Sequence, residues 1–192
     1  MSKLKSNISR RSFLNKTSLA AIGTGLISWK CISDVPNEND GPTLWEEHTE
    51  KEKEQILNSS MAQDIINYPQ LGNSCAESLL KASLKYLGKS EEIGNVAAGF
   101  GGGMGRYDLC GLLTAGYMAI GISAGMIHTE HADISSLTKA NSRSYWEWWE
   151  ERGPIHCHDL KPKYSWDRNN YNIMIQRVAL KIEELISPAV KA

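Results

Sequence analysis

The sequence carries almost no net charge and has no cluster of basic residues interleaved with aromatics. Its 192 residues have a formal net charge of −1 at pH 7, with 41% hydrophobic and 22% charged residues. Proteins that bind nucleic acids present a basic face to the phosphates, so we expect no nucleic-acid partner. The proportions are those of an ordinary globular chain with room for one moderate core.

Paired cysteines are also absent. The chain has four cysteines, Cys31, Cys75, Cys110 and Cys157, and no two of them form a Cys-x-x-Cys motif. This absence excludes a zinc ribbon and a thioredoxin motif, and without Cys-x-x-Cys-His there is no site for covalent c-type haem.

Glycine, by contrast, is concentrated in one segment, GFGGGMGRYDLCG, at residues 99–111. The segment lacks the glycine spacing of a dinucleotide-binding loop and the Gly-Lys-Ser/Thr of a P-loop. We therefore expect the glycines to serve the nearby cysteine. Gly101, Gly102 and Gly103 would bring backbone N–H groups against a sulfur or an anion, and Arg106 would add positive charge.

Helical patterns dominate the chain beyond residue 42, and no segment alternates convincingly as a strand would. Thr43 and Glu46 have capping-box spacing, as do Ser74 and Glu77, and Asp108 can cap the helix after the glycines. These signals predict an all-α fold, a compact domain of about five or six helices around a central Gly/Ala-rich helix. The expected helices span residues 43–61, 75–87, 91–98, 108–126 and 170–187, with a Trp-rich helix that ends at Gly153-Pro154.

The central helix has more than one interpretation. Residues 109–127 carry no charge over a length that could cross a membrane. Small residues recur there every four positions, at Gly111, Ala115, Ala119 and Ser123, and such a face lets helices approach closely in membranes and in soluble cores. We interpret the segment as a buried central helix; the alternatives are a membrane span or the core of a homodimer.

The N-terminus is expected to be a separate part of the chain. The sequence SRRSFL at residues 9–14 resembles the twin-arginine export signal, and a short, weakly apolar stretch follows it. We expect residues 1–31 to be a signal or membrane anchor, residues 32–42 a linker and residues 43–192 the functional domain. The protein would then be exported to the periplasm or the extracytoplasmic face of the membrane, with membrane association through its N-terminus.

Two cysteines lie where helices are predicted to begin. Cys75 directly follows Ser74, and Cys110 follows Asp108 by two residues. Because free N–H groups and partial positive charge gather at a helix N-terminus, we expect a lowered pKa for both thiols, which would suit redox chemistry or metal binding. The alternative is that these cysteines are small residues that pack in the core.

The third cysteine stands in the sequence His156-Cys157-His158, just after a helix stop. In a strand or a loop these neighbours would point in different directions, so we expect Cys157 and one of the two histidines to serve as ligands of a metal ion. The alternative for the histidines is exposure to solvent.

These motifs resemble a known family. The segments NSCAESLL, GFGGGMGRYDLCGLLTAGYMAIG and CHDL resemble the C-GCAxxG-C-C family, to which redox activity is attributed, over residues 72–185. A domain of split-Soret cytochrome c is similar. The resemblance implies an all-α domain in which Cys75, Cys110 and Cys157 hold a metal ion or an iron–sulfur cluster, or cycle as thiols. The family's last cysteine is missing here; its place falls near Met174, whose side chain we expect to point inward.

We therefore hypothesise an exported protein with a thiol-based redox or metal-binding centre, holding an iron–sulfur cluster or a single metal ion. Electron transfer to a redox partner is favoured over substrate turnover because no acid–base pair or nucleophile–base arrangement is visible in the sequence. The competing hypothesis is a non-catalytic structural or membrane-associated helical protein whose cysteines only pack. A homodimer is compatible with either hypothesis.

Overall fold

A computed structural model describes residues 43–164 and 168–191 of the chain. The expected signal and linker, residues 1–42, lie outside the described residues, and so do Cys31 and both of the expected domain boundaries near residues 31 and 42. Within the described ranges the regular structure is helical, and a single isolated bridge takes the place of any strand. The prediction of an all-α fold is confirmed.

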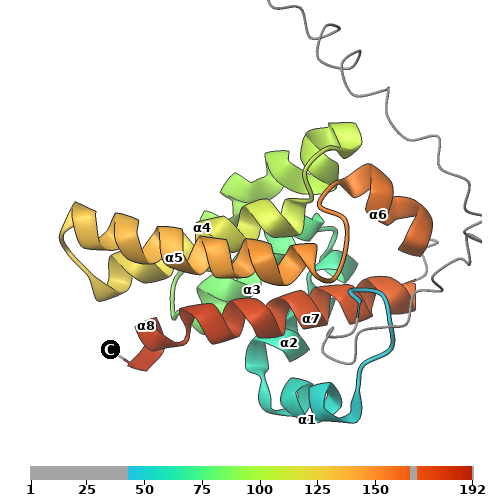
Figure 1. The fold of residues 1–192 in the computed structure, drawn as a ribbon, viewed down its shortest axis with the longest axis horizontal. Coiled ribbons are helices and arrows are strands. Elements are labelled where there is room, and N and C mark those ends of the chain that lie inside the picture. Colours follow the sequence, from blue (N-terminus) through green and yellow to red (C-terminus); the bar gives the residue numbers. More distant parts are fainter. Residues whose placement is uncertain (1–42, 165–167, 192) are drawn as a thin grey trace, which may run out of the picture. The chain divides into compact units, whose positions relative to one another are not determined.

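The helices follow one another with short connections (Figure 1). In chain order they are α1 (Glu50–Asn58), α2 (Ser60–Asp64), the short 3₁₀ turns η2 (Ile65–Asn67) and η3 (Pro69–Leu71), α3 (Cys75–Tyr86), η4 (Glu91–Phe100), η5 (Gly103–Tyr107), α4 (Gly111–Ile127), α5 (His131–Glu150), α6 (Cys157–Tyr164), α7 (Arg168–Ile186) and α8 (Pro188–Lys191).

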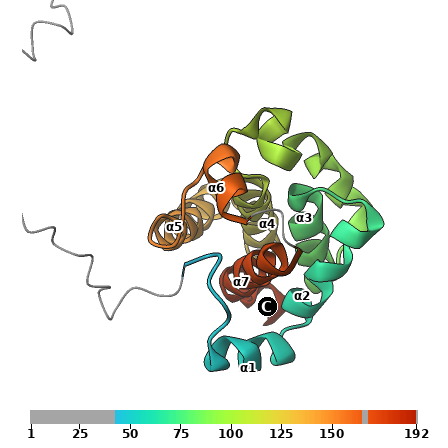
Figure 2. The same cartoon turned by 90° about the vertical axis from the view of Figure 1, so that its right-hand side faces the viewer.

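The central helix is α4, as the small-residue pattern predicts. It packs against α3, α5 and α7, and the end-on view in Figure 2 shows these three helices around it. In the described part of the chain, no helix is long and apolar enough to cross a membrane. Its contacts make α4 the central helix of the core, as expected.

Small residues let the neighbours of α4 come close. A Cβ added at Gly116 would meet the ring of Tyr145 on α5 and lie 2.9 Å from Cδ1 of Ile182 on α7. Tyr145 is fully buried, and its hydroxyl donates to the carbonyl of Leu112 at 3.2 Å. The glycine therefore allows α5 and α7 to close on the same point of α4.

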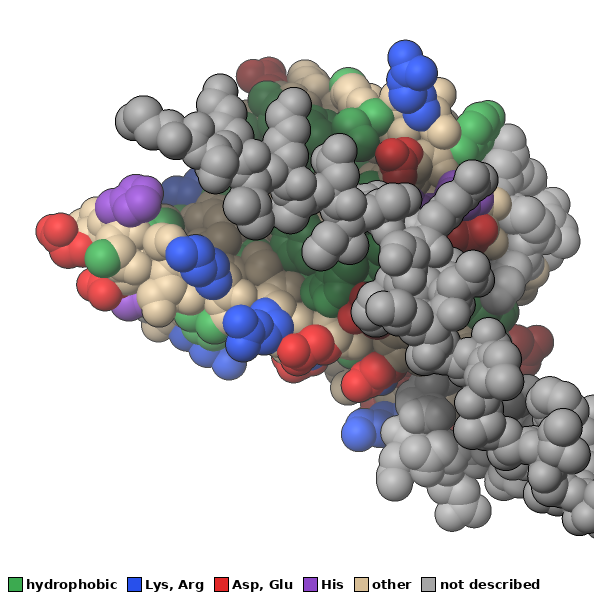
Figure 3. Space-filling view, turned by 45° about the horizontal axis from the view of Figure 1, so that its top comes forward, with side chains coloured by type: hydrophobic (Ala, Val, Ile, Leu, Met, Phe, Trp, Pro, Cys, Tyr) green, Lys and Arg blue, Asp and Glu red, His purple; other side chains and the backbone are tan. Residues whose placement is uncertain are grey.

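The opposite side of α4 is left open. Gly121 and Gly125 have nothing within 4 Å of an added Cβ, and Met118 and Ile122 are only partly buried. On the face drawn in Figure 3, hydrophobic side chains gather along the middle, with charged side chains around them. If the protein forms the expected homodimer, the second copy would pack against this open side of α4.

The first helix begins later than expected. Thr43 and Glu46 do bond as a capping pair would, with the Thr43 N–H donating to Glu46 Oε2 at 3.1 Å, but they form a turn. The complete capping box belongs to Thr49 and Glu52 at the start of α1. The expected helix over 43–61 is wrong because Leu44 is fully buried and its N–H donates to the Arg152 carbonyl, which holds this segment outside a helix.

A buried arginine on α7 fastens this N-terminal segment. Arg177 is 3% exposed; it donates to the carboxylate of Glu52 at 2.7 and 2.9 Å and to the carbonyl oxygens of Thr43, Glu46 and Glu47. Burial alone would raise the pKa of Glu52, but the hydrogen bond from Arg177 holds it below its usual value. The guanidinium thus satisfies carbonyl groups that a helix would otherwise have paired.

The packing at Gly116 can be tested by substitution. Gly116→Ala should lower the free energy of unfolding by about 1–3 kcal/mol, because the added methyl group overpacks the contact with Tyr145 and Ile182. Gly125→Ala is the matched control on the same helix, at an exposed position with open space. It should raise the free energy of unfolding by up to about 1 kcal/mol through helix propensity. Urea denaturation measures both, and two changes of the same sign would contradict the packing.

Candidate thiol site

The first thiol lies at the start of α3, as the sequence predicts. Ser74 is the N-cap residue, and its backbone N–H donates to Glu77 Oε2 at 2.9 Å while its hydroxyl accepts from the Glu77 N–H at 3.3 Å. This capping box places Cys75 at the first helical position. Backbone hydrogen bonds from Gly102, Ala76 and Gly111 all favour the thiolate form of its sulfur.

The glycine run makes a left-handed turn that delivers one of these donors. Gly102, Gly103, Met104 and Gly105 have φ values of +60°, +61°, +56° and +68°. A residue with a Cβ costs roughly 1–2 kcal/mol in this conformation, so glycine is favoured at most of these positions. The turn follows η4 and sets the N–H of Gly102 toward Cys75, which agrees with the expectation that the glycines bring main chain against a sulfur.

The other expected glycines have packing roles. A Cβ at Gly101 would collide with Cβ of Ser74, and one at Gly103 would collide with the backbone of Asp108. Gly101 therefore lets the turn close on the residue that caps α3, and Gly103 lets it close on the segment that leads to Cys110. Arg106 lies in η5 with its side chain exposed.

Gly111 follows Cys110 in the sequence and contacts the side chain of Cys75. A Cβ at this position would lie 2.7 Å from the Cys75 sulfur and 2.8 Å from the Phe100 carbonyl oxygen. The sulfur of Cys75 therefore rests directly against the peptide unit between Cys110 and Gly111. The Cys-Gly pair in the sequence was a signal for this contact, but the sequence analysis assigned Gly111 only to the small face of the helix.

Cys110 is the N-cap residue of α4 and is 4% exposed. The prediction that Asp108 caps this helix is wrong. The backbone N–H of Cys110 donates to the Ile155 carbonyl at 2.9 Å. This hydrogen bond holds the backbone at Cys110 in a non-helical conformation, just before α4 begins. The Asp108 side chain instead lies 2.9 Å from Nδ1 of His156.

The third cysteine is brought to the same place by backbone pairing. Leu109 and His156 form an isolated antiparallel bridge, and the N–H of Cys157 donates to the Asp108 carbonyl at 2.7 Å. Cys157 then begins α6, which the sequence analysis did not predict. All three described cysteines, which are free thiols, therefore lie at helix starts.

The two histidines turn to polar partners in the paired segment. His156 faces the Asp108 carboxylate, and Nδ1 of His158 lies 3.0 Å from the Tyr107 carbonyl oxygen. Their rings stack with centroids 5.4 Å apart. Within residues 43–164 and 168–191, no three side chains of His, Cys, Asp or Glu are arranged to hold one metal ion.

Burial controls the ionisation of the thiols. It raises the pKa of Cys75, against the opposing effect of the backbone hydrogen bonds. It raises the pKa of Cys110 strongly, and the charges of Cys75 and Cys157 act in the same direction. The expectation that the helix starts would lower the pKa of Cys75 and Cys110 is therefore wrong in its net sign, because desolvation outweighs the helix N-terminus.

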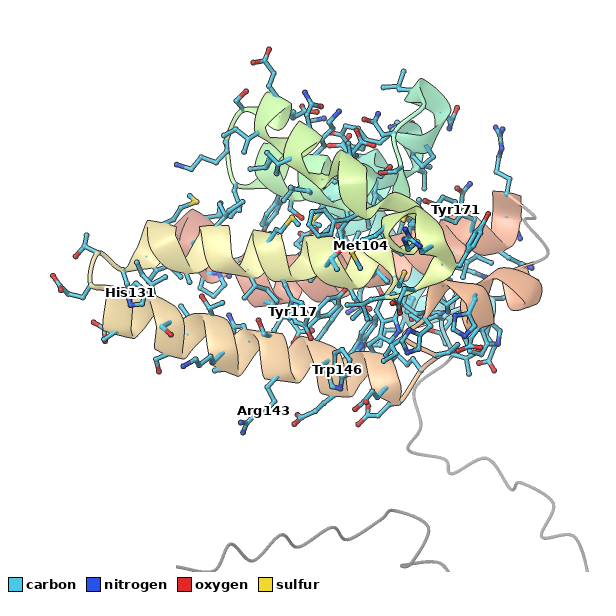
Figure 4. All side chains as sticks on the ribbon, turned by 90° about the horizontal axis from the view of Figure 1, so that it is seen from above. Met104, Tyr117, His131, Arg143, Trp146 and Tyr171 are labelled. Carbon is cyan, nitrogen blue, oxygen red and sulfur yellow. The ribbon has the colours of Figure 1, made fainter. Side chains whose placement is uncertain are left out.

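A tyrosine missed by the sequence analysis faces the same cluster. Burial raises the pKa of Tyr171 on α7, and the charges of Cys75, Cys110 and Cys157 raise it further. Its phenol therefore lies within electrostatic reach of all three sulfurs. Figure 4 labels Tyr171 at the end of the molecule where the glycine turn carries Met104. No local sequence pattern indicates this role, since it depends on how α7 packs on α3.

The missing fourth cysteine has a structural replacement. Met174 is 4% exposed and shares a buried face with Val178 and Ile182. The expectation that its side chain points inward is confirmed. Met174 thus contributes to the core of α7.

Fold and site together define an all-helical domain with three thiols gathered at helix starts. A model of the family described as "Putative redox-active protein (C_GCAxxG_C_C)" matches residues 73–185, which is more than half of the chain. The chain therefore belongs to this family. No curated protein and no solved structure matches the chain.

The contact at Gly111 gives a direct test of the site. Gly111→Ala should displace the Cys75 sulfur and lower the free energy of unfolding by about 1–3 kcal/mol, as overpacking does. The matched control is Gly99→Ala, because Gly99 is exposed, has open space around an added Cβ and needs no positive φ. Thermal denaturation gives the stabilities, and alkylation of Cys75 followed by mass spectrometry reports its environment. An unchanged Cys75 in Gly111→Ala would contradict the contact.

The raised pKa of Cys75 predicts its pH dependence. An unperturbed thiol has a pKa of about 8.5, which is the midpoint of its alkylation profile. In the folded, reduced protein, the rate at which iodoacetamide alkylates Cys75 should therefore keep rising with pH well above this value. In urea, where burial is lost, the pH dependence of the alkylation rate should have its midpoint near the ordinary thiol pKa. Mass spectrometry of the Cys75 peptide measures both profiles. A plateau below about pH 8 in the folded protein would mean that the N–H groups outweigh burial.

Proposed function

We propose that the domain is a thiol–disulfide redox protein whose working pair is Cys75 and Cys110. Membership of a family described as redox-active supports a redox function. The choice of residues rests on one observation, the position of the Cys75 sulfur against the peptide unit that joins Cys110 to Gly111. Of the other two thiols, Cys75 also has the larger electrostatic effect on Cys110.

The surroundings of the two thiols suit different parts in the exchange. Cys75 is partly buried and receives backbone hydrogen bonds that favour its thiolate, so it is suited to attack a partner. Cys110 is almost fully buried and has the more strongly raised pKa, so it is suited to complete the reaction inside the protein.

The exchange balances with a disulfide as oxidant. The Cys75 thiolate attacks one sulfur of the partner disulfide, the partner's S–S bond breaks, and one partner thiol leaves. Cys110 loses its proton and attacks the mixed disulfide, which releases the second partner thiol and leaves a Cys75–Cys110 disulfide. Two electrons pass to the partner, which becomes two thiols, and the reverse steps reduce the protein.

An iron–sulfur cluster or a single metal ion is the second candidate for the same centre. Three convergent cysteines could supply thiolate ligands. The arrangement fits this candidate less well, because His156 and His158 face other partners and no described trio of side chains is set to hold an ion. We therefore place thiol exchange first.

Export by the twin-arginine route stays part of the proposal. It is supported by the paired arginines Arg10 and Arg11 before a weakly apolar stretch. An oxidising compartment outside the cytoplasm would let a Cys75–Cys110 disulfide persist. The expected redox partner would meet the protein there.

The working pair can be identified by mapping disulfides. Reduced protein treated with 2-hydroxyethyl disulfide, quenched in acid and digested should give a peptide linked through Cys75 and Cys110, with the loss of two hydrogens. Cys110→Ser should trap the mixed disulfide on Cys75, because the second step is then missing. Cys157→Ser should still form the link.

Two results would overturn the proposal. One is that the reduced thiols stay unchanged under this treatment while the protein remains folded. The other is a stoichiometric metal content in protein purified anaerobically, lost together with redox activity in Cys75→Ser; this would transfer the centre to the metal-binding candidate.

A further inference from the structure

A pocket lies next to the thiol site, at the start of α7. Its lining consists of Ile66, Pro69, Gln70, Arg168, Tyr171 and Asn172, and its volume is about 240 Å³. The residues come from two places: the η2–η3 segment that leads into α3, and the first turns of α7. The η2–η3 segment precedes α3, which begins with Cys75, and α7 carries Tyr171, so the pocket shares one element with the thiol cluster and borders the segment that leads to the other.

Tyr171 is the wall that the pocket and the thiol cluster share. Its side chain lines the pocket and packs against the core. Burial and the charges of all three sulfurs raise its pKa. The same phenol side chain therefore lines the pocket and lies within electrostatic reach of the sulfurs.

The lining has a distinct chemistry. Ile66, Pro69 and the Tyr171 ring supply apolar surface, while Gln70 and Asn172 supply amides and Arg168 supplies a positive charge. The amide nitrogen of Gln70 donates to the Ile66 carbonyl at 3.1 Å, which leaves the amide oxygen of this exposed side chain as its acceptor. Among the described residues no carboxylate lines the pocket, and Arg168 is exposed, so its charge can pair with an anion.

We propose that this pocket binds the disulfide substrate of the thiol centre, a small molecule with a carboxylate that pairs with Arg168 and an apolar body that packs on Tyr171. This proposal rests on the thiol–disulfide function proposed above. The volume is below the roughly 300–1,000 Å³ typical of sites for drug-sized ligands, which limits the substrate to a small metabolite-sized disulfide. An arginine can bind a carboxylate in a bidentate manner, which would orient the substrate.

In this arrangement the carboxylate stays at Arg168 while the S–S bond reaches past the edge of Tyr171 to Cys75. The electrons and protons move as in the exchange described above: the substrate disulfide gains two electrons and leaves as two thiols, and Cys75 and Cys110 become a disulfide. The Tyr171 ring would pack against the apolar body of the bound molecule.

The experiment compares two small disulfides as oxidants of the reduced protein. One is 3,3′-dithiodipropionate, which carries a carboxylate at each end, and the other is the neutral 2-hydroxyethyl disulfide. The rate of Cys75–Cys110 disulfide formation is followed by acid quench and mass spectrometry. The measured quantity is the ratio of the anionic rate to the neutral rate.

Arg168→Gln should lower this ratio about fivefold, the upper end of the effect of one solvent-exposed ion pair. The matched control is Arg143→Gln, because Arg143 is exposed on α5 (Figure 4) and outside the pocket; its ratio should equal that of the unmodified chain. The effect at Arg168 should fade at high salt, since the charge is exposed. An unchanged ratio in Arg168→Gln, with both disulfides still reacting, would overturn the pocket and leave the thiol function intact.

A second measurement separates the pocket from the redox chemistry. Suberate has the length and charges of dithiodipropionate but no disulfide, and calorimetry can follow its binding to the full chain. It should bind to the unmodified chain and more weakly to Arg168→Gln. If both disulfides leave the thiols unchanged but suberate binds in this way, the thiol function falls while the pocket stands. If suberate does not bind, the pocket proposal falls.

Discussion

The sulfur of Cys75 occupies the space that a side chain at position 111 would need, and much of the domain is arranged around that contact. It requires glycine at residue 111, which sets the start of α4 against the start of α3. It also requires the chain before α4 to approach from the correct side, which the left-handed turn at Gly102, Gly103 and Gly105 provides. The pairing of Leu109 with His156 then brings Cys157 to the same end of the helices.

The thiol site places two opposing effects on the same atoms. Helix starts and the glycine turn direct N–H groups at Cys75, while burial penalises its charged form, and burial is the larger effect. For Cys110 the imbalance is greater, because the other two sulfurs add their own repulsion. A pair of thiols that resists ionisation suits a slow, partner-dependent exchange better than indiscriminate reaction with oxidants.

Local sequence signals predicted the elements whose stability is local. The Ser74–Glu77 capping box placed α3 correctly, and the recurring small residues identified α4 as the central helix. The first helix could not be placed because two capping boxes compete, and the choice between them depends on the burial of Leu44 and on Arg177, which is far away in the sequence.

The same limit applies to the site. The sequence predicted that the glycine run would bring main chain against a cysteine sulfur, and the N–H of Gly102 does so at Cys75. It could not show that Asp108 would bind His156 in place of capping α4, or that Cys157 would begin a helix, because both follow from pairing between distant segments. The sign of the thiol pKa shifts was also beyond it, since desolvation depends on the packed core. Tyr171 lies near the thiols only because α7 packs on α3.

The reduction potential of the Cys75–Cys110 pair tests the central claim most directly. Protein equilibrated in mixtures of reduced and oxidised dithiothreitol would be quenched with acid, alkylated and weighed by mass spectrometry. If the two sulfurs form one couple, they should oxidise together in a single transition of about 30 mV per tenfold change in ratio, as for two electrons. Thiols that oxidise independently, or a Cys75 that stays reduced at every ratio in the folded protein, would contradict the account.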